Sequence, residues 1–480
     1  MTDLNLTTLA AGKTVISAEA IEVFPAGLRG SMLREDDAAY EEARAIWNAM
    51  IERKPGLIVR CAGASDVINA VRFARDNRLL VAVRGGGHNI AGSALCDGGL
   101  MIDLSPMKSV RVDPFAQRAW VEPGATLADV DKETQAFGLA VPTGINSTTG
   151  IAGLTLGGGF GWLTRKFGLT LDSLLSADVV TAAGELVRAS ATENPDLFWA
   201  LRGGGGNFGI VTAFEFQLHK VGPEVLSGLV VHPFADAREV LREYRDALAA
   251  SPEEFTTWVV MRKAPPLPFL PAEWHGKEVV VLAMCYCGPI EKGEEAAARM
   301  RAIGKPIADV VSPHSFVAWQ QAFDPLLAPG ARNYWKSHDF AEVSDAAIDL
   351  LIGAVRELPG PECEIFIGYV GGEASRVPAE ATAFPQRLPH FVMNVHARWR
   401  DPAMDKTCID WARRLYEDAK PLAIGTAYIN FMPEDEVDRV EAAYGSNYRR
   451  LAEIKQRYDP LNMFRMNQNV QPKKGLRAAE

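Results

Sequence analysis

Cysteine is scarce in this sequence, and its placement argues against two kinds of site. Only six cysteines occur in 480 residues, which does not match the dense pairing of a disulfide scaffold. Cys285 and Cys287 alternate onto one face of a predicted strand, and no second Cys/His pair nearby completes a metal site. We therefore expect buried, reduced thiols and no metal centre.

Long apolar runs and basic clusters are also missing. No apolar segment approaches the ~20 residues of a membrane-spanning helix, and the N-terminus lacks the basic start and apolar run of a signal peptide. A net charge of −10, without a Lys/Arg cluster, disfavours a nucleic-acid partner. We expect a cytoplasmic protein that binds a small molecule, with no membrane or nucleic acid as partner; the oligomeric state stays open.

Hydropathy patterns predict alternating helices and strands near the N-terminus. A chain of 480 residues with 48% hydrophobic and 23% charged residues predicts two or three packed globular units. The pattern predicts a helix over 38–51, a strand over 56–61, and a helix over 64–77 with Ser65 as N-cap. A further strand, 79–84, runs into a group of glycines. Such alternation is typical of units that hold a ligand in the loops at strand ends.

Glycine is concentrated in three clusters within the first half of the chain. They are "VRGGGHNIAGS" (83–93), "GIAGLTLGGGFGWL" (150–163) and "LRGGGGNFGIVTAFEFQL" (201–218). Glycine permits positive φ and lets a ligand approach backbone amides. Three clusters together predict a large anionic cofactor, although each could serve only turns or tight packing.

Two common phosphate-binding motifs do not explain these clusters. No Gly-Lys pair has the upstream glycine of a P-loop. Gly204, Gly206 and Gly209 fit Gly-x-Gly-x-x-Gly, but "IVTAFEFQL" after them alternates like a strand where a Rossmann fingerprint needs a helix. His88 lacks companion metal ligands and a Gly-x-Ser-x-Gly nucleophile elbow. The hypothesis that remains for His88 is an imidazole held against a cofactor by bare backbone.

With these residues the sequence resembles the berberine bridge enzyme-like branch of the vanillyl-alcohol oxidase/p-cresol methylhydroxylase flavoprotein superfamily. The first two clusters, extended as "VRGGGHNIAGSALCDGGLMIDLSPM" and "STTGIAGLTLGGGFGWLTRKFGLTLD", resemble its flavin loops. "GGGGNFGIVTAFEF" resembles the strand beside the cofactor, and "YGSNYRRLAEIKQRYDPLNMFRMNQNVQP" the C-terminal signature. The four motifs occur in the family's order and cover nearly the whole chain.

The resemblance implies an α+β fold with two domains. Residues 1–222 would form an FAD-binding domain of p-cresol methylhydroxylase type with two subdomains. Residues 223–424 would form a substrate-binding domain, a large antiparallel sheet backed by helices. Residues 425–480 would return to the FAD-binding domain.

The resemblance also implies the cofactor and its surroundings. FAD would be bound covalently through its 8α-methyl group to His88. Asn467 and Asn469 could give amide hydrogen bonds to the flavin, or could cap a loop. The other residues expected at the cofactor are Arg84, Gly85, Gly86, Gly87, Asn89, Ser93, Asn146, Thr148, Thr149, Gly150, Gly153, Gly158, Asn207, Ile210 and Val211.

Three positions depart from the family pattern. Asn146 stands where members with two flavin attachments have a cysteine, so we expect a single attachment without a cysteinyl link. Thr149 stands where members often have a small or branched apolar residue that gates oxygen. Phe431 replaces the last tyrosine of a Tyr-x-Asn-Tyr motif that supplies part of the base in sugar- and polyketide-oxidising relatives.

The resemblance implies an oxidase that transfers a hydride from a C–OH or C–N bond of a small molecule to flavin N5 and reduces O2 to H2O2. The alternatives are a dehydrogenase with another electron acceptor and a flavin-holding protein without turnover. Tyr369 and then Tyr428 are the candidates for base or substrate anchor, although each could be a packed aromatic. The substrate could be a sugar, an alkaloid, a phenol or an amine.

Overall fold

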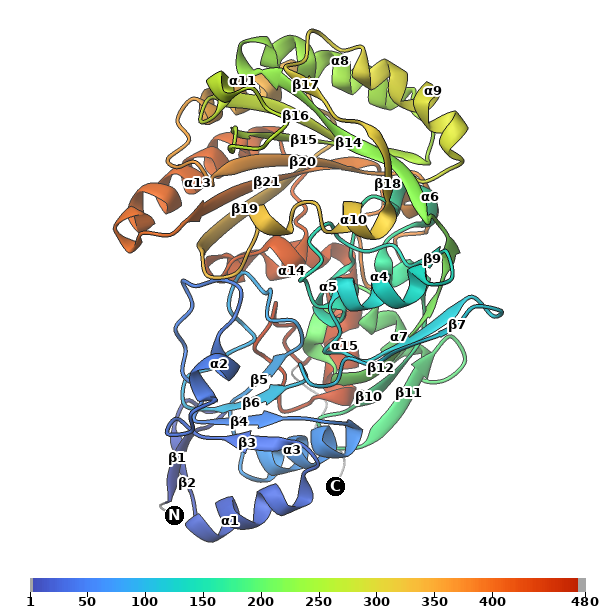
Figure 1. The fold of residues 1–480 in the computed structure, drawn as a ribbon. Coiled ribbons are helices and arrows are strands. Elements are labelled where there is room, and N and C mark those ends of the chain that lie inside the picture. The colour runs from blue at the N-terminus through green and yellow to red at the C-terminus, as the bar shows by residue number, and fades with distance from the viewer. Residues whose placement is uncertain (1–2, 474–480) are drawn as a thin grey trace.

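A computed structural model describes residues 3–473, and it has the predicted α+β fold (Figure 1). The terminal residues 1–2 and 474–480, which belong to the predicted segments 1–222 and 425–480, lie outside the described part. Three main sheets organise the described residues. No helix between residues 3 and 473 is long and apolar enough to cross a membrane.

A four-stranded sheet forms the N-terminal part. Its order is β3-β4-β6-β5, with β4, β6 and β5 parallel and β3 antiparallel. The strands are β3 (Ser31–Leu33), β4 (Leu57–Arg60), β5 (Val81–Arg84) and β6 (Leu100–Asp103). The two outer strands of the parallel group, β4 and β5, were predicted from their apolar runs, as is usual for strands buried on both faces. The first glycine cluster directly follows β5.

An antiparallel five-stranded sheet follows, in the order β11-β10-β12-β8-β7. Its strands are β7 (Val110–Asp113), β8 (Arg118–Val121), β10 (Leu174–Val180), β11 (Leu186–Ser190) and β12 (Ile210–Gln217). A strand, β12, therefore follows the third glycine cluster, which confirms that its Gly-x-Gly-x-x-Gly match is not a Rossmann fingerprint.

An antiparallel eight-stranded sheet is formed wholly by residues between 223 and 424. Its order is β17-β14-β16-β15-β20-β21-β19, with β18 also paired to β14. Its strands are β14 (Glu224–Pro233), β15 (Phe255–Lys263), β16 (Glu278–Tyr286), β17 (Ala308–Asp309), β18 (Ser312–Ser315), β19 (Arg332–Phe340), β20 (Glu364–Val370) and β21 (His390–Trp399).

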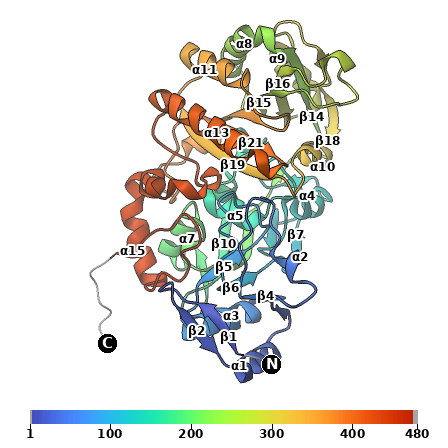
Figure 2. The same ribbon diagram turned by 90° about the vertical axis from the view of Figure 1, so that its left-hand side faces the viewer.

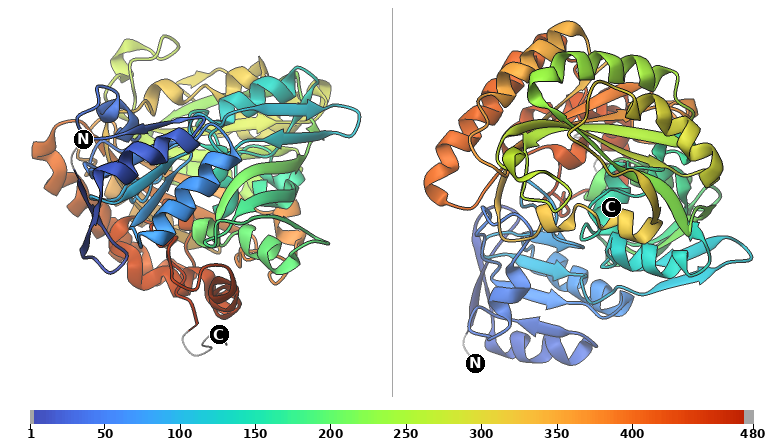
Figure 3. Two further views of the ribbon diagram at one scale, coloured as in Figure 1. Left: turned by 90° about the horizontal axis from the view of Figure 1, so that it is seen from below. Right: turned by 45° about the horizontal axis from the view of Figure 1, so that its top comes forward.

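Helices cover one face of this sheet and leave the other to the rest of the molecule (Figures 1 and 3). They are α8 (Ala237–Ala249), α9 (Ile290–Arg301), α11 (Asp345–Val355) and α13 (Asp405–Ala419). Strand alternation separates the two faces. On β15, Val259 and Met261 pack in the core under the helices, whereas Trp258 and Val260 belong to the opposite face. That opposite face meets the glycine-rich loops.

The remaining α-helices and strands lie outside the three main sheets and the helices on the eight-stranded sheet. They are β1 (Leu4–Thr7), β2 (Lys13–Ile16), α1 (Ala18–Val23), α2 (Tyr40–Arg44), α3 (Ala64–Asp76), α4 (Leu127–Gln135), β9 (Leu139–Ala140), α5 (Ile151–Gly157), α6 (Thr164–Phe167), α7 (Pro195–Leu201), β13 (His219–Lys220), α10 (Phe316–Gln320), α12 (Glu373–Arg376), α14 (Val440–Tyr444) and α15 (Tyr448–Tyr458). Figure 2 shows α15 beside α7, so the C-terminal segment returns to the first half of the chain.

Two helix predictions near the N-terminus need correction. The helix expected over 38–51 ends at Arg44. Beyond it, Trp47 donates its indole N–H to Leu327 at 2.7 Å, and Asn48 bonds Ile90 and Asn333, so long-range polar contacts replace helical ones. The helix expected behind Ser65 begins one residue before it and follows Gly63.

Candidate active site

A cavity of about 400 Å³ lies between the glycine-rich loops and the free face of the eight-stranded sheet. Most of the predicted site residues line it. They are Gly85, Gly86, Gly87, His88, Asn89, Ser93, Asn146, Thr149, Gly150, Gly153, Ile210, Val211, Asn467 and Tyr428. The sequence motifs therefore converge on one site.

Close packing between two loops explains part of the glycine requirement. A Cβ on Gly86 would lie 2.4 Å from the backbone of Gly150, and a Cβ on Gly150 would lie 2.4 Å from Gly86. Gly87 has a φ of +70°, which L side chains rarely adopt. The first two glycine clusters thus pack directly against each other. At these positions glycine serves tight packing, which was one of the two roles expected for the clusters.

Other glycines leave open space at the cavity. A Cβ on Gly153 would meet nothing within 4 Å, and one on Gly206 would meet only Asn467 Nδ2, at 3.9 Å. Both residues line the cavity. Glycine here keeps the backbone accessible to a bound molecule.

His88 is held by hydroxyl groups and an aromatic ring. Its Nε2 lies 2.9 Å from Thr148 Oγ1, and its Nδ1 lies 3.5 Å from Thr149 Oγ1. The imidazole stacks on Trp47 with ring centroids 5.0 Å apart. Burial lowers the pKa of His88 to about 3, so the ring is neutral.

Asn146 fixes the hydroxyl that faces His88. Thr148 Oγ1 donates to Asn146 Oδ1 at 2.8 Å. Because that hydroxyl has one proton, it accepts from His88, which places the imidazole proton on Nε2 and the lone pair on Nδ1. Thr148 itself does not line the cavity and acts through His88.

The C-terminal segment contributes amides to the cavity wall. Asn467 Oδ1 is buried and has no hydrogen-bond partner within residues 3–473, and the same holds for Asn469 Oδ1. Asn467 lines the cavity, but Asn469 does not. Gln468 also lines the cavity and donates to Met432 at 3.1 Å.

Asn207 and Arg84, both predicted at the cofactor, hold structure behind the cavity wall. Asn207 Nδ2 donates to Gln468 at 3.0 Å, and its Oδ1 accepts from Val470 at 2.9 Å, so it joins the third glycine cluster to the C-terminal segment. The Arg84 side chain donates to the backbone oxygen of Ala43. Neither residue lines the cavity.

Tyr428 lines the cavity with its hydroxyl held in place. The hydroxyl oxygen accepts from Gly159 N and from Asn430 Nδ2, both at 2.9 Å. Burial raises the pKa of Tyr428 to about 12, although both hydrogen bonds lower it. The phenol is therefore neutral at physiological pH and has its own proton left to donate. Gly158 packs behind this ring, outside the cavity wall.

Tyr369 does not reach the cavity, and we do not retain it as a candidate base. On β20, Glu364 and Phe366 line the cavity, and strand alternation turns Tyr369 to the opposite face. Its ring packs against Phe391, with centroids 5.0 Å apart, next to the core under the helices. Tyr369 is therefore a packed aromatic side chain, which was the alternative expected for it.

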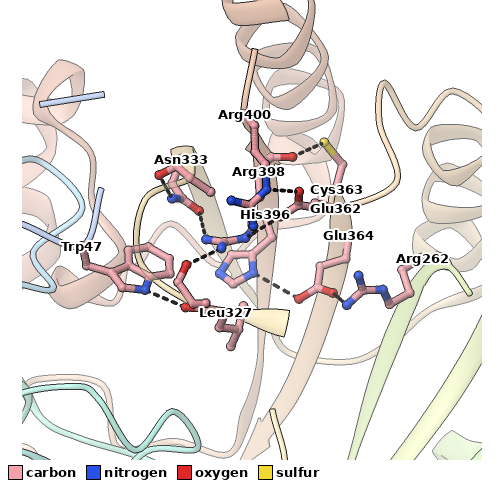
Figure 4. Close-up of polar contacts among 12 residues, drawn as sticks. Trp47, Arg262, Leu327, Asn333, Glu362, Cys363, Glu364, His396, Arg398 and Arg400 are labelled. Carbon is pink, nitrogen blue, oxygen red and sulfur yellow. Dashed lines mark hydrogen bonds and ion pairs between the residues drawn. The ribbon is translucent and has the colours of Figure 1, made fainter. Parts of the chain in front are cut away.

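Sequence reasoning missed a polar row on the sheet (Figure 4). Arg262 donates to Glu364 at 2.7 Å, and Glu364 lies 3.2 Å from His396 Nδ1. His396 packs on Trp335 with ring centroids 4.1 Å apart. The available signal was "NVHARW" within β21, in which polar residues alternate with apolar ones as in a strand with one polar face.

The cavity fits an extended cofactor with polar and aromatic parts, such as FAD. Its loop side offers open backbone at Gly153 and Gly206 and the unpartnered buried oxygen of Asn467. Such groups suit a ligand with hydrogen-bonding groups of its own. Between residues 3 and 473, no group of three or more His, Cys, Asp or Glu side chains is placed to hold a metal ion.

Comparison with known proteins agrees with this site. Residues 55–190 match the family described as FAD binding domain, and residues 427–471 match the family described as berberine and berberine like. The first match holds two cavity loops, and the second holds Tyr428 and the amides of the C-terminal segment.

Similar proteins span the whole chain. An FAD-linked oxidoreductase of Dictyostelium discoideum is 31% identical over 464 residues, which are 95% of this chain and 98% of that protein. The (R)-6-hydroxynicotine oxidase of Paenarthrobacter nicotinovorans is 31% identical over 93% of this chain and 98% of its own length. The crystal structure of 6-hydroxy-D-nicotine oxidase from Arthrobacter nicotinovorans superposes with a TM-score of 0.83 at 29% identity, covering 94% of this chain and 100% of that one.

The loops that touch at Gly86 and Gly150, and the C-terminal segment that closes on them, are those of an FAD-binding enzyme of the vanillyl-alcohol oxidase/p-cresol methylhydroxylase superfamily. The chain belongs to the berberine-like FAD-linked oxidoreductases.

Proposed function

We propose that this enzyme is an oxidase that removes a hydride from a C–OH or C–N bond of a small molecule and passes the electrons to O2, forming H2O2. The observation that carries the proposal is the continuity of the cavity: one space joins His88 and Asn467 on the loop side to Trp258 and His396 on the sheet. A cofactor and a substrate can therefore lie against each other there. The oxidase names of the relatives support the same reaction class.

The loops and the C-terminal segment would hold the cofactor. FAD supplies the acceptor for the hydride when it is bound. We propose one covalent attachment, at Nδ1 of the neutral His88, and no second one, because Asn146 offers no thiolate. Ile210 and Val211 would pack against the cofactor, and Asn467 would bond it.

Tyr428 would orient the substrate and not act as its base. A phenol whose pKa is raised to about 12 stays protonated, and its two accepted hydrogen bonds leave one donor directed by Gly159 and Asn430. The hydroxyl can donate to an oxygen or nitrogen of the bound molecule.

Turnover of candidate substrates tests the function. The purified holoenzyme would be mixed without oxygen with aromatic alcohols, sugars and cyclic amines in turn. Loss of the flavin absorbance at about 450 nm with at least one compound, and H2O2 formation on admitting air, are expected. Bleaching without H2O2 under air, but with turnover of a quinone, would favour the dehydrogenase alternative. No bleaching with any compound would contradict the proposal.

A further inference from the structure

Four side chains form a row across the cavity face of the eight-stranded sheet. Arg262, Glu364, His396 and Trp335 are directly paired, each with the next, on β15, β20, β21 and β19. Paired residues of antiparallel strands project from the same face, and all four line the cavity. The register of the sheet therefore places a guanidinium, a carboxylate, an imidazole and an indole side by side.

The ion pair within this row fixes the tautomer of His396. Burial alone would raise the pKa of Glu364, but the Arg262 guanidinium and the His396 imidazole lower it to about 2. The ionised carboxylate accepts the Nδ1 proton of His396 at 3.2 Å, which puts the lone pair on Nε2. No group within residues 3–473 bonds Nε2, although the ring lines the cavity. His396 thus offers an unoccupied proton acceptor to a bound molecule.

The charged side chains beside His396 are all paired, and Arg400 shares the Glu362 carboxylate with Arg398 (Figure 4). Arg262 faces Glu364 at 2.7 Å. Arg398, two residues further along β21, pairs with Glu362 at 3.1 Å (Figure 4). On the β19 side the neighbour is the neutral ring of Trp335. A proton taken up at Nε2 therefore produces an imidazolium stabilised by Glu364, as in a carboxylate–histidine pair of a hydrolase.

Apart from Asn394, whose buried Oδ1 has no partner within residues 3–473, the rest of this half of the cavity is lined mainly by apolar side chains. Its walls include Val231, Leu267, Phe269, Val279 and Val281. A sugar bound against such walls would bury hydroxyls without partners, at a cost of about 1–3 kcal/mol each. The lining instead suits a ring or hydrocarbon frame with one or two polar groups.

We propose that His396 is the catalytic base that takes the hydroxyl proton of an apolar, ring-bearing alcohol, with Glu364 and Arg262 as positioning residues. The proposal rests on the oxidase function proposed above. The substrate O–H bond breaks and its proton passes to Nε2. The O–H electron pair becomes the second bond of the carbonyl, while the C–H bond breaks and its electron pair leaves as the hydride that the oxidase reaction transfers to FAD.

Binding of 4-nitrophenol to the holoenzyme tests the proton acceptor without turnover. The anion of this phenol is yellow, so absorbance reports its ionisation in the cavity. In the wild type, bound 4-nitrophenol should ionise at a pH about one unit or more below that in solution, because an imidazolium forms beside it. His396→Gln should abolish this shift, whereas His219→Gln, outside the cavity wall, should keep it. Absence of saturable binding, or an equal shift in His396→Gln, would overturn the proposal.

The pH profile of turnover tests the same role kinetically. With an aromatic alcohol that bleaches the flavin, His396→Gln should lower kcat/KM about 100-fold or more and remove the acid limb of the profile. Glu364→Gln, which keeps the shape but not the charge, should lower kcat/KM and displace that limb. Flavin content monitors folding in both variants. An unchanged profile in His396→Gln, or turnover confined to sugars or to cyclic amines, would overturn the proposal.

Different results would contradict the oxidase function and the assignment of His396 as the base. If no compound bleaches the flavin, the oxidase function fails, while the ionisation of 4-nitrophenol still reports on His396. If bleaching occurs but neither the phenol nor the pH profile responds to His396→Gln, the oxidase function stands and only the base assignment falls.

Discussion

At His88, neighbouring oxygens decide which ring nitrogen can react. Thr148 donates its only hydroxyl proton to Asn146 and accepts the proton of Nε2. Nδ1 therefore keeps its lone pair, and burial holds the pKa of the ring at about 3, so the ring does not lose that lone pair to a proton near neutral pH. Asn146, at the position where the resemblance implies a cysteine in members with two flavin attachments, thus has a role of its own: it orients the Thr148 hydroxyl, which in turn orients the imidazole.

Thr148→Val should slow the covalent attachment of FAD to His88 that we propose. The variant removes the acceptor for Nε2–H and frees the imidazole to adopt the other tautomer. We expect attachment about tenfold slower, equivalent to roughly 1.4 kcal/mol in the barrier, when apoprotein is mixed with FAD and the flavin that co-precipitates with protein in acid is followed over time. Thr148→Ser keeps the hydroxyl and should match the wild type.

His88→Ala completes this experiment. It should leave all FAD extractable in acid, and flavin that stayed attached to this variant would exclude His88 as the tether. Equal rates for Thr148→Val and Thr148→Ser would contradict the orienting role of the hydroxyl.

At the level of single elements, a buried lysine attaches the C-terminal segment to the third glycine cluster. Lys455 on α15 donates to Asn207, Asp459 and Phe464 at 2.7, 2.7 and 2.9 Å. The Lys455 and Asp459 side chains are 0% exposed. Asp459 also accepts from the backbone of the turn that leads to the cavity-lining amides. This ion pair sets the course of the segment that closes the cavity.

Lys455→Met should destabilise the protein strongly, because it leaves the buried Asp459 carboxylate without its cation. We expect a loss of about 3–5 kcal/mol in urea unfolding and a lower FAD content. Lys473→Met makes the same change at a half-exposed ion pair with Glu453 and should cost less than about 1 kcal/mol. Similar losses in the two variants would contradict the structural role of Lys455.

The elements also show where sequence reasoning succeeds and where it stops. The strands β4, β5 and β12 follow from local periodicity. The loop residues around His88 are contiguous in the sequence, so a motif can identify them. Arg262, Glu364 and His396 lie side by side only because of the register of their strands. Tyr369 lies on the same strand as Glu364 but on the opposite face of the sheet, so it does not reach the cavity. Neither relation is visible before the sheet is assembled.

On the scale of the whole molecule, buried polar contacts join the two halves of the chain beside the cavity. Gln320 on α10 donates to Thr143 at 2.9 Å and to Asp131 on α4 at 3.2 Å. Asp324 accepts from the backbone of Ser147 at 2.9 Å. Asp131 is 1% exposed, and its Oδ1 has no partner within residues 3–473. Burial raises the pKa of Asp131 to about 7, although Gln320 lowers it.

Asp131 should make the stability of the folded protein depend on pH. In the unfolded chain this carboxyl ionises near its ordinary pKa of 3.8, whereas in the fold it stays protonated up to about 7. Between these values the folded state binds more protons than the unfolded state, so the free energy of unfolding falls as pH rises. The free energy of unfolding falls by roughly 1.4 kcal/mol per pH unit in this range. Above the pKa of Asp131 in the folded state it falls no further on account of this group.

Asp131→Asn removes this titration. The stability of the variant relative to the wild type should therefore increase between pH 4 and pH 7 and stay level above that range, with a total change of roughly 4 kcal/mol. Urea unfolding of both proteins across this range measures it, and because all other titrating groups are common to the two, their difference isolates Asp131. A stability difference between Asp131→Asn and the wild type that does not vary with pH would contradict this prediction. It would mean that the Asp131 carboxyl is already ionised in the fold across this range, and that the contact between α4 and α10 contains a charge.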